Sequence, residues 1–132
     1  MTELLRPSLY GSQHPTIVVP KGGKATCATA EEAKYVVVGH CCESGDLVTP
    51  ADGEPETLFE RPMGKAEIGD MLVMEGAGAY CSSMSTKHYN SFPEAAEVMV
   101  DGDQMHVIRA RQDYKEIWAN EVSLPGSVFG SN

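Results

Sequence analysis

A β-branched run, Tyr35-Val36-Val37-Val38-Gly39, leads directly into the polar stretch His40-Cys41-Cys42-Glu43-Ser44-Gly45-Asp46. A short apolar run that ends at a glycine is typical of a buried strand. We expect the polar residues after it to lie on a loop that this strand holds in place. A thiol, Cys42, and an acid, Glu43, would then stand side by side, so the sequence predicts a site of chemistry on this loop.

Similar short runs, separated by Gly, Pro and Asp, recur along the chain and predict a mainly β domain. We expect strands at residues 16–20, 34–39, 70–75, 96–100 and 104–110. Asp101-Gly102 predicts a hairpin between the last two, because Asp and Gly tolerate the positive φ angles of tight turns. Residues 50–55 are expected to form an exposed loop or hairpin tip, and residues 61–69 another loop.

One helix is expected near the C-terminus. Asp113 and Glu116 have the spacing of a capping box. The apolar residues of this segment have helical spacing: Tyr114, Ile117, Trp118 and Val122. The tail, residues 125–132, is rich in Gly and Ser and is expected to be flexible.

Size and charge restrict the class of protein. The 132 residues predict one domain, 1–132, of which 42% are hydrophobic, enough for a sizeable core. A formal net charge of −9 argues against nucleic acid and anionic membranes as partners. The sequence has neither the apolar length of a membrane span nor a signal peptide, so we expect a cytoplasmic protein whose four cysteines are free thiols.

Four short motifs occur in a fixed order: Arg6-Pro7-Ser8-Leu9-Tyr10, Cys42-Glu43-Ser44-Gly45-Asp46, Gly78-Ala79-Tyr80 and Tyr89-Asn90-Ser91. Together they closely resemble the C-terminal domain of the diaminopimelate decarboxylase family, which uses pyridoxal phosphate and is one of the alanine-racemase-like decarboxylases. The resemblance runs from about residue 4 to about residue 124, although Phe92 stands where relatives commonly carry Arg. It implies a Greek-key-like β-barrel or sandwich with one C-terminal helix.

The resemblance also implies roles for five residues. Arg6 and Tyr10 would bind a substrate carboxylate, a task suited to the planar guanidinium. Glu43 would hold the distal ammonium of the substrate, and Cys42 would act near the reacting carbon, both reaching across a dimer interface into the partner's site. Tyr80 would approach both cofactor and substrate. A positioned acid is useful here, because a decarboxylase must control where a proton arrives after carbon dioxide leaves.

Blander interpretations of the same residues remain open. Arg6 can make a surface ion pair, Tyr10 can pack, Cys42 can serve as a small hydrophobe and Glu43 can simply be solvated. Pro7 is expected to keep Arg6 out of regular helix. Asp46 is expected to be structural, accepting backbone hydrogen bonds in the Gly45 turn.

Two other kinds of site are not expected. Gly76-Ala77-Gly78 lacks the third glycine and the helix of a dinucleotide-binding motif. His40, Cys41, Cys42 and Cys81 lack the usual Cys-x-x-Cys spacing, so we expect no metal site. None of the six lysines has a context that suggests a Schiff base, and Lys87 is no exception.

The family's N-terminal barrel, which carries the Schiff-base lysine and most phosphate contacts, has no counterpart in the chain. By resemblance, the chain is a fragment that is inactive alone and acts in a homodimer with that pyridoxal-phosphate-binding barrel, converting meso-2,6-diaminopimelate to L-lysine. We expect its open sheet edge to pair with a second copy. A related ornithine, arginine or carboxypolyamine decarboxylase domain, and a non-catalytic dimerisation or regulatory module, are the alternatives; Arg6 with Glu43 favours a substrate whose far end is zwitterionic.

Overall fold

The computed structural model describes residues 1–22 and 31–126, and its strands form four antiparallel pairs. The pairs are β1 (Thr16–Val19) with β6 (Met71–Met74), β2 (Glu32–Tyr35) with β5 (Arg61–Gly64), β3 (Pro50–Ala51) with β4 (Glu54–Leu58), and β7 (Glu97–Asp101) with β8 (Gln104–Arg109). Two short α-helices, α1 (Arg6–Tyr10) and α2 (Tyr114–Ile117), and two 3₁₀ turns, η1 (Ser82–Met84) and η2 (Tyr89–Ser91), complete the described elements. The fold is therefore mainly sheet with few helices, as expected.

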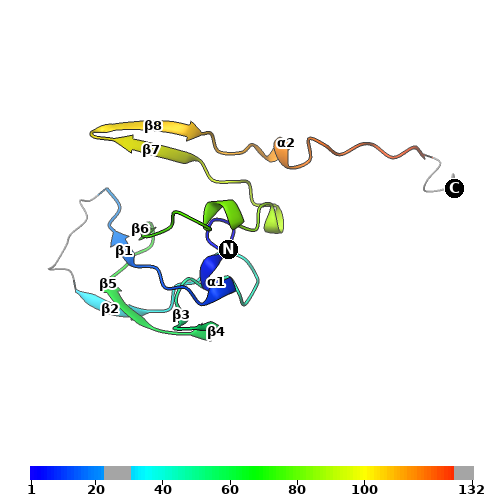
Figure 1. The fold of residues 1–132 in the computed structure, drawn as a ribbon. Coiled ribbons are helices and arrows are strands. Elements are labelled where there is room, and N and C mark those ends of the chain that lie inside the picture. The colour runs from blue at the N-terminus through cyan, green and yellow to red at the C-terminus, as the bar shows by residue number, and fades with distance from the viewer. Residues whose placement is uncertain (23–30, 127–132) are drawn as a thin grey trace.

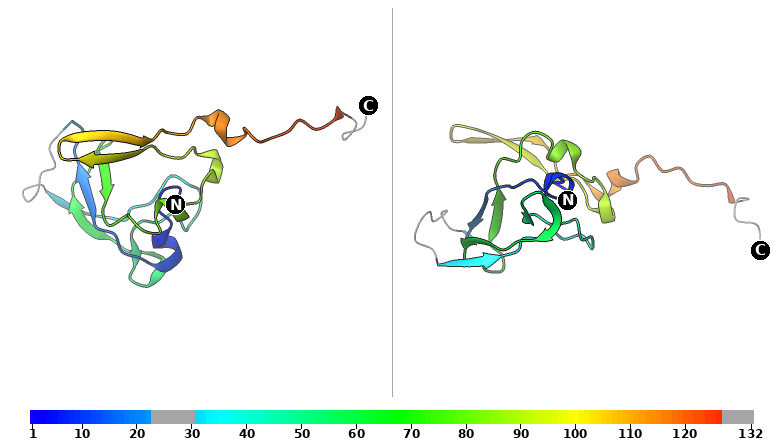
Figure 2. Two further views of the ribbon diagram at one scale, coloured as in Figure 1. Left: turned by 45° about the horizontal axis from the view of Figure 1, so that its top comes forward. Right: turned by 60° about the horizontal axis from the view of Figure 1, so that its bottom comes forward.

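A closed barrel is not present in the described residues. The four pairs are separate two-stranded sheets in the hydrogen-bonding pattern, although β1 also packs against β5. Figures 1 and 2 show β1 to β6 and α1 grouped together, with the β7–β8 hairpin lying along one side of them and the chain beyond α2 extending away. The Greek-key-like barrel or sandwich stays a prediction.

The apolar run that opens the sequence forms less strand than expected. β2 ends at Tyr35, and Val38 makes only an isolated bridge to Leu47. The Val37 amide donates to the Thr49 hydroxyl at 2.9 Å, so a side chain takes the place of a neighbouring strand. Val38 is 61% exposed. The prediction of a buried strand over residues 34–39 was thus wrong beyond Tyr35, and none of these six residues is fully buried.

Residues 61–69 were expected to form a loop, and this was wrong for the first four. Residues Arg61–Gly64 form β5, which pairs with β2 and buries Met63. Residues 50–55 do form a hairpin tip, with Gly53 at φ +71° between β3 and β4, but Pro50 itself is buried. The strands expected around β1, β6, β7 and β8 agree with the structure to within one residue at each end.

Both helices depend on their first turns. α1 begins at Arg6 although Pro7 follows, because first-turn amides need no helical partner. The expectation that Pro7 excludes Arg6 from the helix was wrong. In α2 the expected capping box is present: Asp113 accepts from the Lys115 amide at 3.0 Å, and Glu116 accepts from the Asp113 amide at 2.6 Å.

α2 ends after four residues, because the apolar stripe around it has nothing to pack against in the described chain: Trp118 is 50% exposed and Val122 86%. None of the described helices is long and apolar enough to cross a membrane. Cys27 and most of the predicted tail, residues 127–132, lie outside the described residues.

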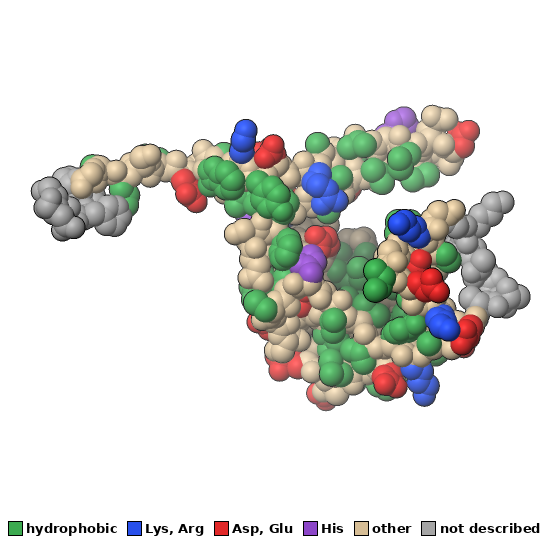
Figure 3. All heavy atoms as spheres, turned by 180° about the vertical axis from the view of Figure 1, so that it is seen from behind, with side chains coloured by type: hydrophobic (Ala, Val, Ile, Leu, Met, Phe, Trp, Pro, Cys, Tyr) green, Lys and Arg blue, Asp and Glu red, His purple; other side chains and the backbone are tan. Residues whose placement is uncertain are grey.

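The buried apolar core of the described chain is small. It consists of Leu4, Leu47, Val48, Met63 and Cys81. Large apolar side chains on β6, β7 and β8 are instead exposed, and Figure 3 shows hydrophobic side chains along the hairpin and around the hollow beneath it. The sizeable core expected from length and composition is therefore not present in the described residues, because no other described element covers these faces.

Candidate functional site

Asp46 organises the loop that carries Cys42 and Glu43. Its side chain is buried, and its carboxylate accepts hydrogen bonds from the Cys41 amide at 2.8 Å and from the Met1 nitrogen. The Gly39 amide donates to its backbone oxygen at 2.8 Å. Burial alone would raise the pKa of Asp46, but the hydrogen bonds outweigh it, so the pKa lies below its ordinary value. The structural role expected for Asp46 is confirmed, but its carboxylate binds the Cys41 amide, whereas the amide of the Gly45 turn is bound by Glu43.

Gly39 has to be glycine in this arrangement. A Cβ atom at this position would lie 2.1 Å from Asp46 Oδ2, far closer than any real contact. The buried carboxylate and the bare backbone of Gly39 therefore fit each other. Together they fix the base of the loop between residues 39 and 46.

Cys42 and Glu43 both project from this loop and are exposed. One oxygen of Glu43, Oε1, accepts from the Gly45 amide at 2.9 Å and from the Ser44 hydroxyl at 3.4 Å. The carboxylate thus stiffens its own turn with one oxygen. The neighbouring thiol, Cys41, is half-buried; burial and the Asp46 carboxylate raise its pKa, so Cys41 is held in its neutral form and is the poorer candidate for chemistry.

A second segment, η2, lies against this loop. The side-chain amide of Asn90 donates to Cys42 Sγ at 3.6 Å, and the rings of His40 and Phe92 pack with centroids 4.0 Å apart. Partial burial and the nearby Glu43 and cysteine thiols raise the pKa of Tyr89. The Tyr89-Asn90-Ser91 motif had no predicted role, and only the contact with Cys42 reveals one.

The backbone around η2 is strained. Every non-glycine residue with positive φ in the described chain lies between residues 80 and 91: Tyr80, His88, Asn90 and Ser91. Such conformations cost free energy and tend to cluster where ligands bind. The segment that contacts Cys42 is thus also the one in which strain gathers.

Helix α1, which begins at Arg6, contacts the same loop. The Ser8 hydroxyl of this helix donates to the Gly45 carbonyl oxygen. Arg6 Nε is shielded from solvent yet has no hydrogen-bond partner among the described residues. Arg61, in contrast, donates to Gln13, to the His14 carbonyl and to the Pro50 carbonyl. Arg6 therefore offers an unused donor on the helix that contacts the loop, and among the described residues Arg109 Nε is shielded and unpartnered in the same way.

The two tyrosines predicted for the site are both exposed. Tyr10 ends α1 and is 57% exposed. Tyr80 is 62% exposed and follows Gly76 and Gly78 on an open loop. No hydrogen bond in the described chain joins either tyrosine to Cys42 or Glu43. The structure therefore places Cys42 and Glu43 on one loop that the helix of Arg6 contacts through Ser8, and the roles of all five predicted site residues stay predictions.

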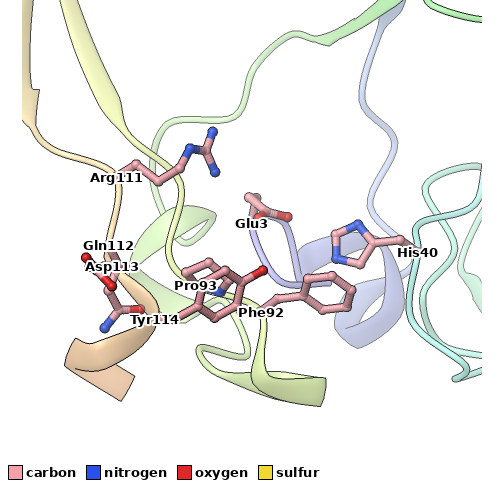
Figure 4. A pocket seen from close by; sticks show the side chains of 8 residues that line it. All are labelled: Glu3, His40, Phe92, Pro93, Arg111, Gln112, Asp113 and Tyr114. Carbon is pink, nitrogen blue, oxygen red and sulfur yellow. The ribbon is translucent and has the colours of Figure 1, made fainter. Parts of the chain in front are cut away.

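A cavity of about 460 Å³ lies on the other side of the His40 and Phe92 rings. Figure 4 shows Arg111, Gln112 and Asp113 at one end of it, His40 at the other, and Glu3, Pro93, Tyr114 and Phe92 between them. His40 belongs to both the loop and the wall of the cavity, but none of the five residues predicted for the site lines the cavity. It is therefore a neighbour of the Cys42–Glu43 loop rather than the loop's own pocket.

The described residues show no metal centre, and two of their five lysines are held in ion pairs. No group of three His, Cys, Asp or Glu side chains within residues 1–22 and 31–126 could hold a metal ion. Lys65 and Lys87 are exposed and paired with Glu31 and Glu94 at 3.0 and 2.7 Å. A lysine that bonds to an aldehyde cofactor has to be free of such partners.

Comparisons with known proteins agree with one another. Residues 1–78 match the family described as pyridoxal-dependent decarboxylase, C-terminal sheet domain. The diaminopimelate decarboxylase of Buchnera aphidicola subsp. Baizongia pistaciae is 38% identical over 122 residues, which cover 92% of this chain and 28% of that protein. The enzyme of Streptomyces coelicolor is 39% identical over 128 residues, 96% of this chain and 28% of that protein.

Solved structures give the same result. A crystal structure of diaminopimelate decarboxylase superposes with a TM-score of 0.81 at 37% identity, over 89% of this chain and 27% of that one. That of the Helicobacter pylori enzyme complexed with L-lysine superposes with a TM-score of 0.69 at 33% identity, over 90% and 25%. The chain thus spans about 28% of the length of the curated relatives described above.

Proposed function

The chain belongs to the pyridoxal-dependent decarboxylase family, as its C-terminal sheet domain, and on this premise we propose that it is the substrate-binding and dimerisation domain of a diaminopimelate decarboxylase. The proposed reaction removes one carboxylate from meso-2,6-diaminopimelate and yields L-lysine. The partner would be the N-terminal barrel domain that relatives of full length carry. The 132 residues alone are expected to be inactive.

The unpaired donor of Arg6 is the observation that carries this proposal. A guanidinium nitrogen shielded from water without a hydrogen bond is costly, and a bound carboxylate would remove that cost. The Ser8 contact links the same helix to the loop of Glu43, whose carboxylate suits an ammonium group. The far end of diaminopimelate offers both groups, whereas ornithine offers only the ammonium.

The described residues would supply only part of a binding site for pyridoxal phosphate. The Schiff-base lysine is proposed to come from the N-terminal barrel domain, because all five described lysines are exposed and lie outside the loop of Cys42 and Glu43, and two of them, Lys65 and Lys87, are engaged in ion pairs. Tyr80 is the residue of this chain that would face the cofactor, since its exposed ring leaves it free to do so. When bound, the cofactor supplies an electron sink for the carbanion left after decarboxylation.

The residues of this chain would then bind and orient the substrate. Arg6 and Tyr10 would hold the far carboxylate, and Glu43 the far ammonium. The Cys42 thiol would lie near the reacting carbon, where it can deliver a proton or keep other donors away. Because Cys42 and Glu43 are exposed on a projecting loop, they are free to serve the site of a second subunit in a homodimer.

The test is a carbon dioxide release assay on the full protein with meso-2,6-diaminopimelate. Replacing Arg6 by Gln is expected to raise KM by about 10- to 100-fold, since a charge-assisted hydrogen bond contributes roughly 1.5 to 3 kcal/mol. Arg111→Gln, an exposed arginine outside the proposed site, is the matched control and should leave KM unchanged. Turnover of ornithine in preference to diaminopimelate would overturn the substrate assignment, and activity of the 132 residues alone would overturn the division of roles.

A further inference from the structure

Asn90 makes the hydrogen bond that the described chain offers to the Cys42 thiol. Its side-chain Nδ2 lies 3.6 Å from Cys42 Sγ, a distance that suits the large radius of sulfur. Cys42 and Asn90 are 48 residues apart in the sequence, so this contact depends on how two loops meet. Both side chains are exposed, and the contact is therefore formed at the surface where a substrate could reach it.

The backbone of Asn90 is adapted to this contact. Its φ and ψ angles are 52° and 27°, in the left-handed region that Asn tolerates better than most residues. This conformation lies within a 3₁₀ turn and interrupts its regular geometry. This backbone conformation is strained and does not belong to a regular helix. The strain accompanies the placement of the Asn90 side chain against Cys42.

A second contact keeps the two loops in register. His40 comes just before the two cysteines, Phe92 comes just after η2, and their rings pack at 4.0 Å and 55°. The loop of Cys42 and Glu43 is thus joined to η2 at two points. Because Asp46 and Gly39 already fix the base of this loop, the Asn90 contact acts on its tip.

We propose that Asn90 is a positioning residue that holds the Cys42 thiol in one orientation and thereby sets how the Cys42–Glu43 tip faces the substrate. An amide N–H that donates to the sulfur fixes the direction of Sγ, so the side chain is expected to keep one rotamer while the contact lasts. The catalytic meaning of this contact rests on the function proposed above, but the contact itself can be tested without any substrate.

The test measures alkylation of Cys42 by iodoacetamide across a range of pH in the full protein, in a Cys41→Ser background, with the modified peptide quantified by mass spectrometry. Asn90→Gly removes the amide but tolerates the left-handed backbone, so it isolates the hydrogen bond. It is expected to slow alkylation by about three- to tenfold, the effect of one ordinary hydrogen bond. Asn90→Asp keeps the shape but faces the sulfur with a carboxylate, and is expected to slow alkylation further and move its pH profile to higher pH.

Ser91→Gly is the matched control. Ser91 also has a positive φ, of 60°, but makes no side-chain hydrogen bond in the described structure. It should react like the parent protein. Asn90→Gly and Asn90→Asp proteins that alkylate at the parental rate and with the parental pH profile would overturn the proposal.

A steady-state assay of the same variants separates this proposal from the function. Asn90→Gly should lower kcat for diaminopimelate decarboxylation while KM stays near that of the parent, because the contact orients the thiol rather than the far end of the substrate. A rise in KM with kcat unchanged would overturn the positioning role. The two proposals can also fail separately. If the parent protein has no decarboxylase activity but its alkylation still depends on Asn90, the proposed function is overturned and the contact between Asn90 and Cys42 is supported.

Discussion

Single side chains decide the shape of the candidate site, and Asp46 is the plainest case. Its carboxylate is expected to stabilise the fold because its pKa lies below the ordinary value, the opposing effect of burial being outweighed by hydrogen bonds from Met1 and Cys41. A carboxyl group with a depressed pKa adds stability above its unfolded pKa of about 3.9 and loses that stability as the pH falls through its folded pKa. Stability should therefore fall with acid in a way that depends on Asp46.

Asp46→Asn is the corresponding variant. It should destabilise the protein at pH 7 by about 1 to 3 kcal/mol, since a buried amide cannot accept both hydrogen bonds in the same way. The difference from the parent should persist down to about pH 4 and shrink as the pH falls below that value. Urea unfolding at several pH values measures this, with Asp52→Asn at the exposed β3–β4 tip as control. A difference that does not change with pH would show that the Asp46 charge is not involved.

The elements show where local sequence was enough and where it was not. Asp101-Gly102 predicted the β7–β8 hairpin correctly, because turn chemistry acts over two residues: Asp101 pairs with Gln104, and Gly102 has a φ of +60°. β5 was missed because Pro62 and Gly64 look like strand breakers. It forms because β2, about 29 residues earlier, pairs with it and Met63 becomes buried, and no local pattern contains that information.

The early end of β2 leads to a prediction about Thr49. This side chain is fully buried, and its hydroxyl accepts the Val37 amide at 2.9 Å. Thr49→Val keeps the volume but leaves that amide without a partner, so it should cost about 1 to 3 kcal/mol of unfolding free energy and speed hydrogen exchange at the Val37 amide. Thr57→Val, on the exposed face of β4, serves as control. Unchanged exchange at Val37 would mean that the hydroxyl is not its partner.

The candidate site repeats this division between local and distant information. The four sequence motifs alone are enough to mark the segments of Arg6, of Cys42 with Glu43 and of Asn90, although the helix at Arg6 and the turn at Asn90 were not predicted. Their meeting depends on Ser8 touching Gly45 and on Asn90 touching Cys42, contacts across 37 and 48 residues. Spacing along the chain does not contain such distances, so the pairing of Asn90 with Cys42 could not be predicted.

At the scale of the whole molecule, composition gives the number of apolar residues but does not predict how many of them are buried. A hydrophobic share of 42% is ordinary for a folded domain, yet only five hydrophobic side chains form the core of the described residues. A sequence lists apolar residues without saying which surface covers them. The curated relatives are more than three times as long as this chain, and we expect their additional residues to cover the faces of β6, β7 and β8.

The 132 residues alone should therefore associate through the β7–β8 hairpin. Val98, Val100, Met105 and Val107 share one face of it and are each 47% to 70% exposed, and the outer edges of both strands have no strand partner in the described chain. Unpaired, apolar strands pair readily with a second copy.

Sedimentation velocity at rising concentration should show a dimer. The double variant Val100→Lys with Val107→Lys should be a monomer, because two charges on the shared face oppose its burial. Thr57→Lys on the exposed β4 surface should leave the dimer intact, and a parent chain that stays monomeric at high concentration would contradict association through this hairpin.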